Sequence, residues 1–155
     1  MAAAQLGLKL AADLEATVHL LSVIDSGRDR VLSTLSGADI DADERREGAS
    51  DTLETLATDA RYLGIDVFTE TSTGRPADEI VDYAESASID LIAMRTVGRG
   101  GFERYLLGSV TDSIVRTATV PVLTVRPNEG EWSQSAHRGI PNPIAYQCLD
   151  RTIER

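Results

Sequence analysis

The sequence predicts an α/β domain in which helices cover both faces of a parallel β-sheet. Segments with helical periodicity alternate with short segments rich in β-branched residues, which is typical of a parallel sheet. Most of the short segments are apolar along their whole length, as expected for strands buried on both faces. A length of 155 residues suits one domain with a substantial core.

The first half of the chain predicts two helices and two strands. Leucines at four-residue spacing predict an amphipathic helix over residues 2–15, and a β-rich apolar segment predicts a strand over residues 17–24. Polar residues 26–43 predict a long loop. A second helix then carries an apolar face and ends at Gly64, and residues 65–71 predict the next strand.

The second half continues the alternation. Pro76, at a first-turn position, predicts the start of a third helix, and residues 91–94 predict a short buried strand. Residues 109–118 predict a fourth helix, and Val122–Val125 the last strand. After residue 127 sustained periodicity is lost, so we expect residues 128–155 to form a poorly ordered tail.

Charge composition excludes one broad class of function. The chain has 25 acidic and 15 basic residues and a net charge of −10, whereas a nucleic-acid-binding surface needs a basic stripe. Lys9 is the only lysine among those basic residues. An acidic, lysine-poor surface is typical of a halophilic protein in a high-salt cytoplasm. An ordinary acidic protein from a GC-rich genome is the alternative.

Several absences point to a cytoplasmic protein. Cys148 is the only cysteine, so an internal disulfide cannot form, and a reducing compartment is expected. No apolar run reaches the roughly 18 residues of a membrane span. The N-terminus lacks the basic and apolar regions of a secretory signal.

A glycine- and arginine-rich loop between the strand at 91–94 and the fourth helix is the most informative segment. Glycines allow backbone amides to approach a ligand, and a helix start offers free N–H groups with partial positive charge. Together they predict a cradle for phosphate anions. The alternative is structural: Ser109 with Asp112 three residues later fits an ordinary capping arrangement.

From residue 2 to residue 126, the chain therefore resembles the universal stress proteins, which belong to the adenine nucleotide alpha-hydrolase-like superfamily. Nucleotide-binding members carry a glycine, two residues, a glycine, nine residues, a glycine and then serine or threonine; here Gly98, Gly108 and Ser109 match its second half. The flanking segments DLIAM (90–94) and PVLTVR (121–126) match as well. The resemblance implies a three-layer sandwich with a parallel, Rossmann-like sheet and residues 1–127 as the family's domain.

The resemblance also implies ATP as ligand, with Mg²⁺ as its counter-ion, and a homodimer that pairs through Val122–Val125. Backbone groups of the glycine loop and the helix start would contact the phosphates, two apolar residues would lie near adenine and ribose, and two arginines would supply charge. The implied nucleotide-binding residues are Val23, Met94, Arg95, Gly98, Arg99, Gly108, Ser109 and Val110.

Two departures from the family pattern weaken this expectation. Arg95 stands at the first glycine, and Val97 where a histidine is frequent. A side chain at a glycine position strains any left-handed backbone and can fill the ligand's space. An arginine can instead bind a phosphate through its guanidinium.

The second departure is that the family's first strand, which lies centrally in the sheet, is absent before the first helix. We expect the functional protein to begin upstream of Met1. One alternative is that residues 144–149 fill the gap, although Pro141 and Pro143 argue against a central strand. The other is a truncated, weakly folding chain, because unpaired ladder groups each cost roughly 1–3 kcal/mol.

The sequence offers no catalytic or metal-binding constellation. We interpret His19 as a strand residue whose ring has a hydrogen-bond partner, and His137 and Cys148 lie in the tail. The acidic run at residues 39–44 reads as a solvated helix entry rather than a calcium loop. The protein is therefore expected not to be an enzyme, with weak ATP hydrolysis ranked last. Two classes remain: a nucleotide-binding regulatory protein of the stress response, and a dimeric interaction protein that binds no nucleotide.

Overall fold

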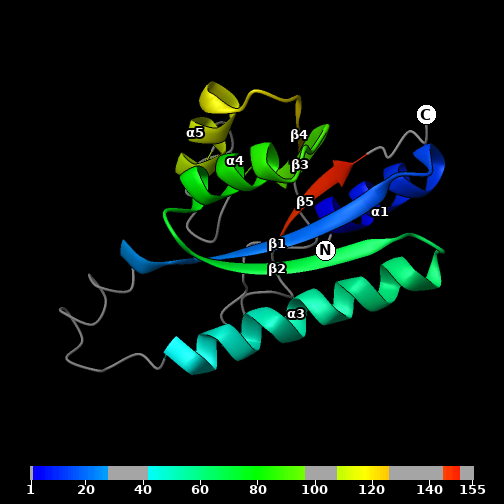
Figure 1. Ribbon diagram of the computed structural model, residues 1–155, viewed down its shortest axis with the longest axis horizontal. Coiled ribbons are helices and arrows are strands. Elements are labelled where there is room, and N and C mark those ends of the chain that lie inside the picture. The colour runs from blue at the N-terminus through cyan, green and yellow to red at the C-terminus, as the bar shows by residue number, and fades with distance from the viewer. Residues whose placement is uncertain (1, 28–41, 97–107, 126–144, 151–155) are drawn as a thin grey trace.

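The protein is described by a computed structural model for residues 2–27, 42–96, 108–125 and 145–150. Its elements, in chain order, are α1 (Ala2–Leu14), β1 (Thr17–Asp25), α3 (Ala42–Tyr62), β2 (Val67–Gly74), α4 (Pro76–Ser86), β3 (Leu91–Arg95), α5 (Ser109–Thr117), β4 (Val122–Val125) and β5 (Ala145–Asp150). They build one five-stranded sheet with helices on both faces, which confirms the predicted α/β class (Figure 1).

Most boundaries follow the predicted pattern. The strand Val122–Val125 is reproduced, and α4 begins at Pro76. Gly64 follows the end of α3 with φ +75, a left-handed conformation that glycine adopts without strain. The helix α3 begins at Ala42, with two acidic residues in its first turn, so the acidic run does lead into a helix.

The sheet order is β2-β1-β5-β3-β4. Strand β1 is parallel to β2, and β3 is parallel to β4. Strand β5 lies between these two pairs and is antiparallel to both β1 and β3. The central position that the resemblance assigns to a strand before the first helix is thus held by a segment near the C-terminus.

The expectation of a poorly ordered tail is therefore wrong for Ala145–Asp150, and the alternative of a tail strand fits the structure. Pro141 and Pro143 do not prevent it because both precede the first residue of β5. All six residues of β5 keep a backbone N–H for the two ladders. The rest of residues 128–155 lies outside the described residues.

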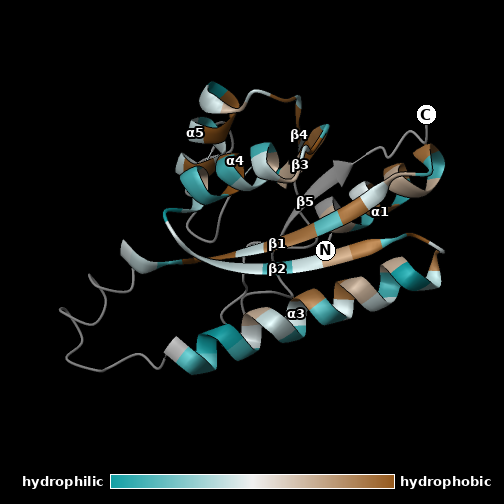
Figure 2. Ribbon diagram, in the orientation of Figure 1, coloured by the Kyte–Doolittle hydropathy of each residue, from teal (hydrophilic) through white to brown (hydrophobic). Residues whose placement is uncertain are grey.

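Two apolar cores lie on opposite faces of the sheet (Figure 2). Along β1, Val18 and Leu20 pack with α1 and α3, whereas Leu21 and Val23 pack with α4, β3 and α5, because side chains alternate along a strand. The first core contains Leu8, Ala11, Ala16, Val18, Leu20, Leu53, Leu56, Ala57, Ala60 and Ile65. The second contains Leu21, Val23, Ile80, Ala84, Ile89, Ile92, Met94 and Ile114.

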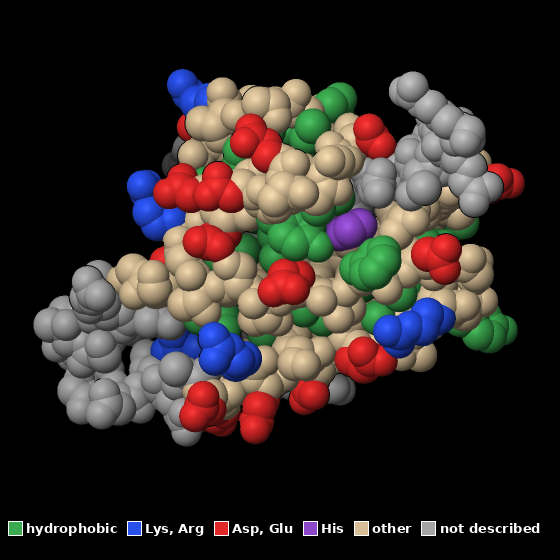
Figure 3. All heavy atoms as spheres, viewed as in Figure 1, with side chains coloured by type: hydrophobic (Ala, Val, Ile, Leu, Met, Phe, Trp, Pro, Cys, Tyr) green, Lys and Arg blue, Asp and Glu red, His purple; other side chains and the backbone are tan. Residues whose placement is uncertain are grey.

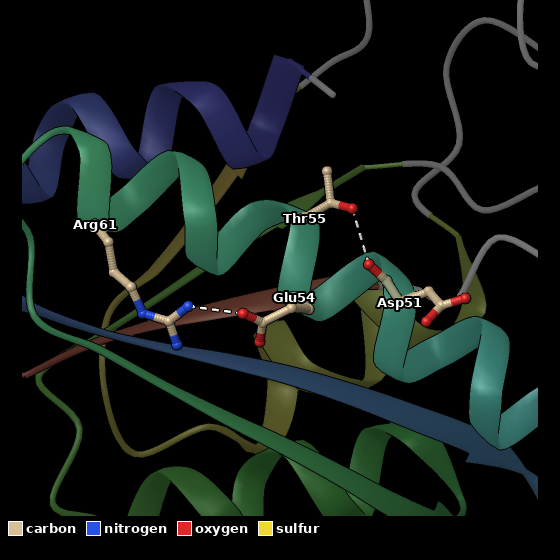
Figure 4. Close-up of polar contacts among 4 residues, drawn as sticks. All are labelled: Asp51, Glu54, Thr55 and Arg61. Carbon is tan, nitrogen blue, oxygen red and sulfur yellow. Dashed lines mark hydrogen bonds and ion pairs between the residues drawn. The ribbon is translucent and has the colours of Figure 1, made fainter.

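The outer surface of α3 is polar. Arg61 Nη1 lies 2.8 Å from Glu54 Oε1, and Thr55 Oγ1 donates to the Asp51 carbonyl oxygen at 2.9 Å (Figure 4). Carboxylate side chains are spread over the face shown in Figure 3, as the acidic composition predicts. Exposed contacts of this kind add little stability. None of the helices in the described part of the chain has the length and apolarity that a membrane crossing requires.

His19 has the satisfied ring that the sequence predicts. Its Nδ1 lies 2.9 Å from the Tyr83 hydroxyl oxygen, and its ring centroid lies 4.9 Å from that of Phe68 on β2. The histidine is therefore a packing and hydrogen-bonding residue that joins β1 to α4.

Candidate functional site

The candidate site lies at the carboxyl ends of β1 and β3. Strand β5 begins at Ala145, opposite Ser22 of β1, and its pairing with β3 ends at Ala93, opposite Gln147. Residues of β1 and β3 beyond this row have no described strand between them. In open α/β sheets, ligands bind in the crevice beyond the carboxyl ends of the strands, at the point where the strand order reverses.

The N-terminus of α5 stands at this edge. Its N-cap is Gly108, with φ −60 and ψ 152 and no side-chain cap. The first backbone bond of the helix runs from the Asp112 N–H to the Gly108 oxygen, at 2.8 Å. The N–H groups of Ser109, Val110 and Thr111 have no acceptor among the described residues. Amides of this kind at a helix start can bind an anion, which makes this helix start a candidate anion site.

Two expectations about this helix start need correction. The Gly108 N–H donates to the Thr96 oxygen at 2.7 Å, so this amide closes the base of the loop and is not free for a phosphate. The capping alternative also fails, because Ser109 is inside the helix and Asp112 pairs with Arg116 at 3.1 Å. The candidate anion site therefore consists of the three amides that follow Gly108.

Val23 and Met94, the residues implied for adenine and ribose, belong to one apolar cluster on the α5 face. They come from β1 and β3, on either side of the position that β5 holds. Both are buried, with 6% and 2% of their surface exposed. Val110 also packs against this cluster, which leaves its backbone amide as the group available to a ligand.

Arg95 is compatible with the backbone at the family's glycine position. It is the last residue of β3, pairs with Val125, and does not have a positive φ. Its carbonyl oxygen accepts a bond from Thr111 Oγ1 at 2.9 Å, which fastens α5 to β3. Strand alternation directs its side chain to the face opposite Met94 and α5. Backbone strain at this position is therefore absent.

Two implied site residues, Gly98 and Arg99, lie outside the described residues, as does Val97. Two others were missed by sequence reasoning: Thr96, whose oxygen accepts the Gly108 bond, and Thr111, whose amide is free and whose hydroxyl bonds Arg95. Their places next to the strand end and in the helix's first turn were visible in sequence. Their bonding partners were not, because these are tertiary contacts.

One cavity in the described part of the chain is a poor candidate for a phosphate site. A cavity of about 280 Å³ opens at the opposite edge of the sheet, between the C-terminal ends of α1 and α3. Glu15 and Asp66 line it, and carboxylates together with helix C-termini repel anions. Within the described ranges, no group of three or more His, Cys, Asp or Glu residues is placed to hold a metal ion.

Comparison with known proteins identifies the family of this chain. The model of the universal stress protein family matches residues 1–126. The universal stress protein MJ0531 of Methanocaldococcus jannaschii is 33% identical, over 83% of this chain and 76% of that protein. The universal stress protein YxiE of Bacillus subtilis is 31% identical, over 73% of this chain and 88% of that protein.

Solved structures give the same result. The MJ0577 protein superposes with a TM-score of 0.67 at 28% identity, covering 81% of this chain and 88% of that chain. The universal stress protein UspA of Lactobacillus plantarum gives a TM-score of 0.59 at 29% identity, covering the same shares of the two chains. The sequence resemblance is thus confirmed, and this chain belongs to the universal stress protein family.

Proposed function

We propose that this universal stress protein binds an adenine nucleotide at the N-terminus of α5 and acts as a regulatory protein of the stress response. The observation that carries the proposal is the set of three amides at Ser109, Val110 and Thr111 that have no acceptor within the described ranges. A polyphosphate supplies the acceptors that these donors lack. Their position at the carboxyl edge, beside the buried Val23 and Met94, suits a ligand with one charged and one flat apolar end.

The local charge supports an anionic ligand despite the net charge of −10. The α5 N-terminus contributes partial positive charge. Arg95, half-exposed at the same edge, makes no side-chain ion pair or hydrogen bond with the described residues, and its guanidinium adds positive charge to this edge of the sheet although its side chain lies on the face opposite α5. In the proposed complex Gly98 and Arg99 complete the phosphate contacts, and Mg²⁺ enters as the counter-ion of ATP.

Calorimetric titration of Mg-ATP into the purified full chain tests the proposal. We expect saturable binding of one nucleotide per chain, and a rise in melting temperature with ATP concentration because a ligand of the native state stabilises it. Adenosine should bind more weakly because it lacks the phosphates. Absence of binding at millimolar ATP, together with purified protein that carries no nucleotide, would refute the proposal.

A dimeric interaction protein is the second candidate, favoured by β4. This strand ends the sheet order, pairs with β3 alone in the described structure, and has only half-buried side chains. An exposed apolar edge strand promotes pairing with another chain. We propose that two β4 edges pair to form a homodimer, an arrangement that is compatible with nucleotide binding.

The ladder between β3 and β4 allows a selective test of the dimer. The Pro121 oxygen accepts a bond from Ile92 of β3, and the Val125 oxygen accepts one from Thr96, just after β3. Residues 121, 123 and 125 therefore face β3, and Thr124 presents its N–H to the open edge. Thr124→Pro should therefore yield a monomer in light scattering and leave the melting temperature of the monomer fold nearly unchanged. A Thr124→Ala control should stay dimeric. A dimeric proline variant would place the interface elsewhere.

We further propose a cytoplasmic location and a role that depends on binding rather than on turnover. The single cysteine favours a reducing compartment. In the described structure the nearest histidine in sequence to the site, His19, is engaged with Tyr83 and Phe68 and offers no general base at α5. Fractionation of host cells and a phosphate-release assay on the purified chain test these two statements.

A further inference from the structure

Strand β2 forms the edge of the sheet opposite to β4, and no strand pairs with its outer side in the described part of the chain. All eight of its residues, Val67–Gly74, pair with β1 in one continuous register. The strand contains no bulge, proline or lysine, and Glu70 is its only charged residue. Bulges, prolines and lysines are common devices that prevent an edge strand from pairing. The outer edge of β2 is therefore open to an added strand.

The pairing with β1 shows which backbone groups of β2 face outward. The Val18 N–H donates to the Asp66 oxygen at 2.8 Å, so residue 66 faces β1. Every second residue from there on also faces β1, because backbone groups alternate in direction along a strand. The N–H and C=O groups that point to the open side belong to Val67, Thr69, Thr71 and Thr73. These are the donors and acceptors to which another strand can bond.

The side chains on one face of β2 form a row with an aromatic ring between two carboxylates. Val67 packs against the core that α1 and α3 cover, so Asp66, Phe68 and Glu70 lie together on the other face of the sheet. Phe68 is 59% exposed, and its ring centroid lies 4.9 Å from that of His19. Figure 3 shows this histidine at the surface beside hydrophobic side chains. The exposed ring therefore offers a supported apolar contact to a partner.

Both carboxylates of the row lack a counter-ion within the described ranges. Asp66 and Glu70 are exposed, and neither side chain forms an ion pair or hydrogen bond there. Arg61, near the C-terminal end of α3, is already paired with Glu54 at 2.8 Å. Residues two apart in a strand are separated by about 6–7 Å, so the carboxylates flank the ring at this spacing. The row therefore carries two negative charges that a basic partner can neutralise.

We propose that the open edge of β2 binds an extended basic segment of a partner protein, which adds one strand to the sheet. Residues opposite one another in adjacent strands point to the same face, so alternate residues of the segment meet Asp66, Phe68 and Glu70. Charge and shape complementarity require a basic, an apolar and a basic residue at these three positions. Backbone bonds to the outward groups of β2 supply the rest of the interface.

A second copy of this chain is a poorer occupant of this edge. Its own β2 would bring Asp66 and Glu70 against the same row, and like charges on adjacent strands are destabilising. A net charge of −10 also favours a basic partner over an acidic one. The β4 edge proposed for the homodimer lies at the other end of the sheet order, so that dimer leaves β2 accessible. The inference does not depend on the nucleotide site.

The experiment titrates two end-blocked peptides into the isotope-labelled full chain at low salt and follows the backbone amide signals by NMR. The first peptide is Thr-Lys-Thr-Val-Thr-Lys-Thr, and the second has glutamate in place of both lysines. We expect saturable binding of the lysine peptide, with the largest shifts in β2. The glutamate peptide should bind at least about tenfold more weakly, because it sets like charges against each other. Added salt should weaken the binding of the lysine peptide by screening.

Two pairs of variants separate the backbone contribution from the charges. Thr69→Pro removes an outward N–H and no bond to β1, so it should bind the lysine peptide about tenfold more weakly and keep its fold. Thr69→Ala is the matched control and should stay within about threefold of the original chain. Asp66→Lys combined with Glu70→Lys should reverse the preference and bind the glutamate peptide more tightly. Glu70→Gln alone should weaken binding of the lysine peptide without lowering the melting temperature.

Several results would overturn the inference. They are the absence of saturable binding at millimolar lysine peptide, equal affinity for the two peptides, shifts centred away from β2, and equal affinity in Thr69→Pro and Thr69→Ala. A lower mass of Thr69→Pro in light scattering would also overturn it, because a second copy would then cover this edge. If a proline or lysine variant does not fold, Glu70→Gln decides: weaker binding of the lysine peptide supports the inference, and unchanged affinity overturns it.

Discussion

A Gln147→Pro substitution in β5 is expected to abolish the cooperative unfolding of the protein. Gln147 is central in this strand and pairs with Leu20 of β1 and Ala93 of β3. Proline removes a ladder N–H and its ring clashes with a neighbouring strand, so it is not tolerated in a central strand. Circular dichroism should show a sharp melting transition in the original chain and none in the variant.

The expected size follows from the position of β5. It contacts both β1 and β3, and it is the element that joins β2-β1 to β3-β4. Without it the facing edges of β1 and β3 keep several unpaired groups, each costing about 1–3 kcal/mol. Their sum rivals a whole domain's stability of about 5–15 kcal/mol. Truncation before Ala145 should have the same effect as the proline.

A stop codon after Asp150 is the control, because it keeps all of β5 and removes only residues 151–155. This variant should melt within a few degrees of the original chain. Thr124→Pro is a second control, since it places a proline in an edge strand. If truncation before Ala145 left the melting transition intact, β5 could not be the strand that joins the two halves of the sheet.

The local elements could be predicted from the sequence, but the place of β5 could not. Hydrophobic periodicity and the positions of glycine and proline are local signals. They correctly predicted the start of α4 at Pro76, the end of α3 before Gly64 and the strand Val122–Val125. Which strands become neighbours is a non-local property. The prolines before residue 145 argued against a strand only as long as its first residue was unknown. The sequence thus predicted the local elements correctly, but it did not show which strands β5 pairs with.

The candidate site likewise has a part that the sequence predicted and a part that it did not. The motif located the helix start, and the free amides of Ser109 and Val110 are there. It did not show that the Gly108 amide bonds Thr96, or that Arg95 sits in strand geometry without a positive φ. Both depend on how β3, β4 and α5 meet. Motif spacing therefore predicts the place of a site better than the role of each residue in it.

Ser109→Pro is expected to weaken ATP binding by about tenfold to a hundredfold while the fold remains intact, given that hydrogen bonds to charged groups are worth about 1.5–3 kcal/mol. Ser109 is the first residue of α5, where proline is well tolerated because its missing N–H has no partner within the helix. The substitution therefore removes one donor of the proposed phosphate site and little else. Calorimetry gives the loss, and a melting curve verifies the fold.

The backbone before Ser109 already suits a proline. Gly108 has φ −60 and ψ 152, within the extended region that proline imposes on the residue before it. Ser109→Ala is the matched control, because it removes the hydroxyl and keeps the amide, and its ATP affinity should fall far less than that of Ser109→Pro. Equal affinities in the two variants would mean that the hydroxyl or neighbouring arginines hold the phosphate. A large difference would assign the binding to the backbone of α5, the group of donors that the helix itself leaves unmet.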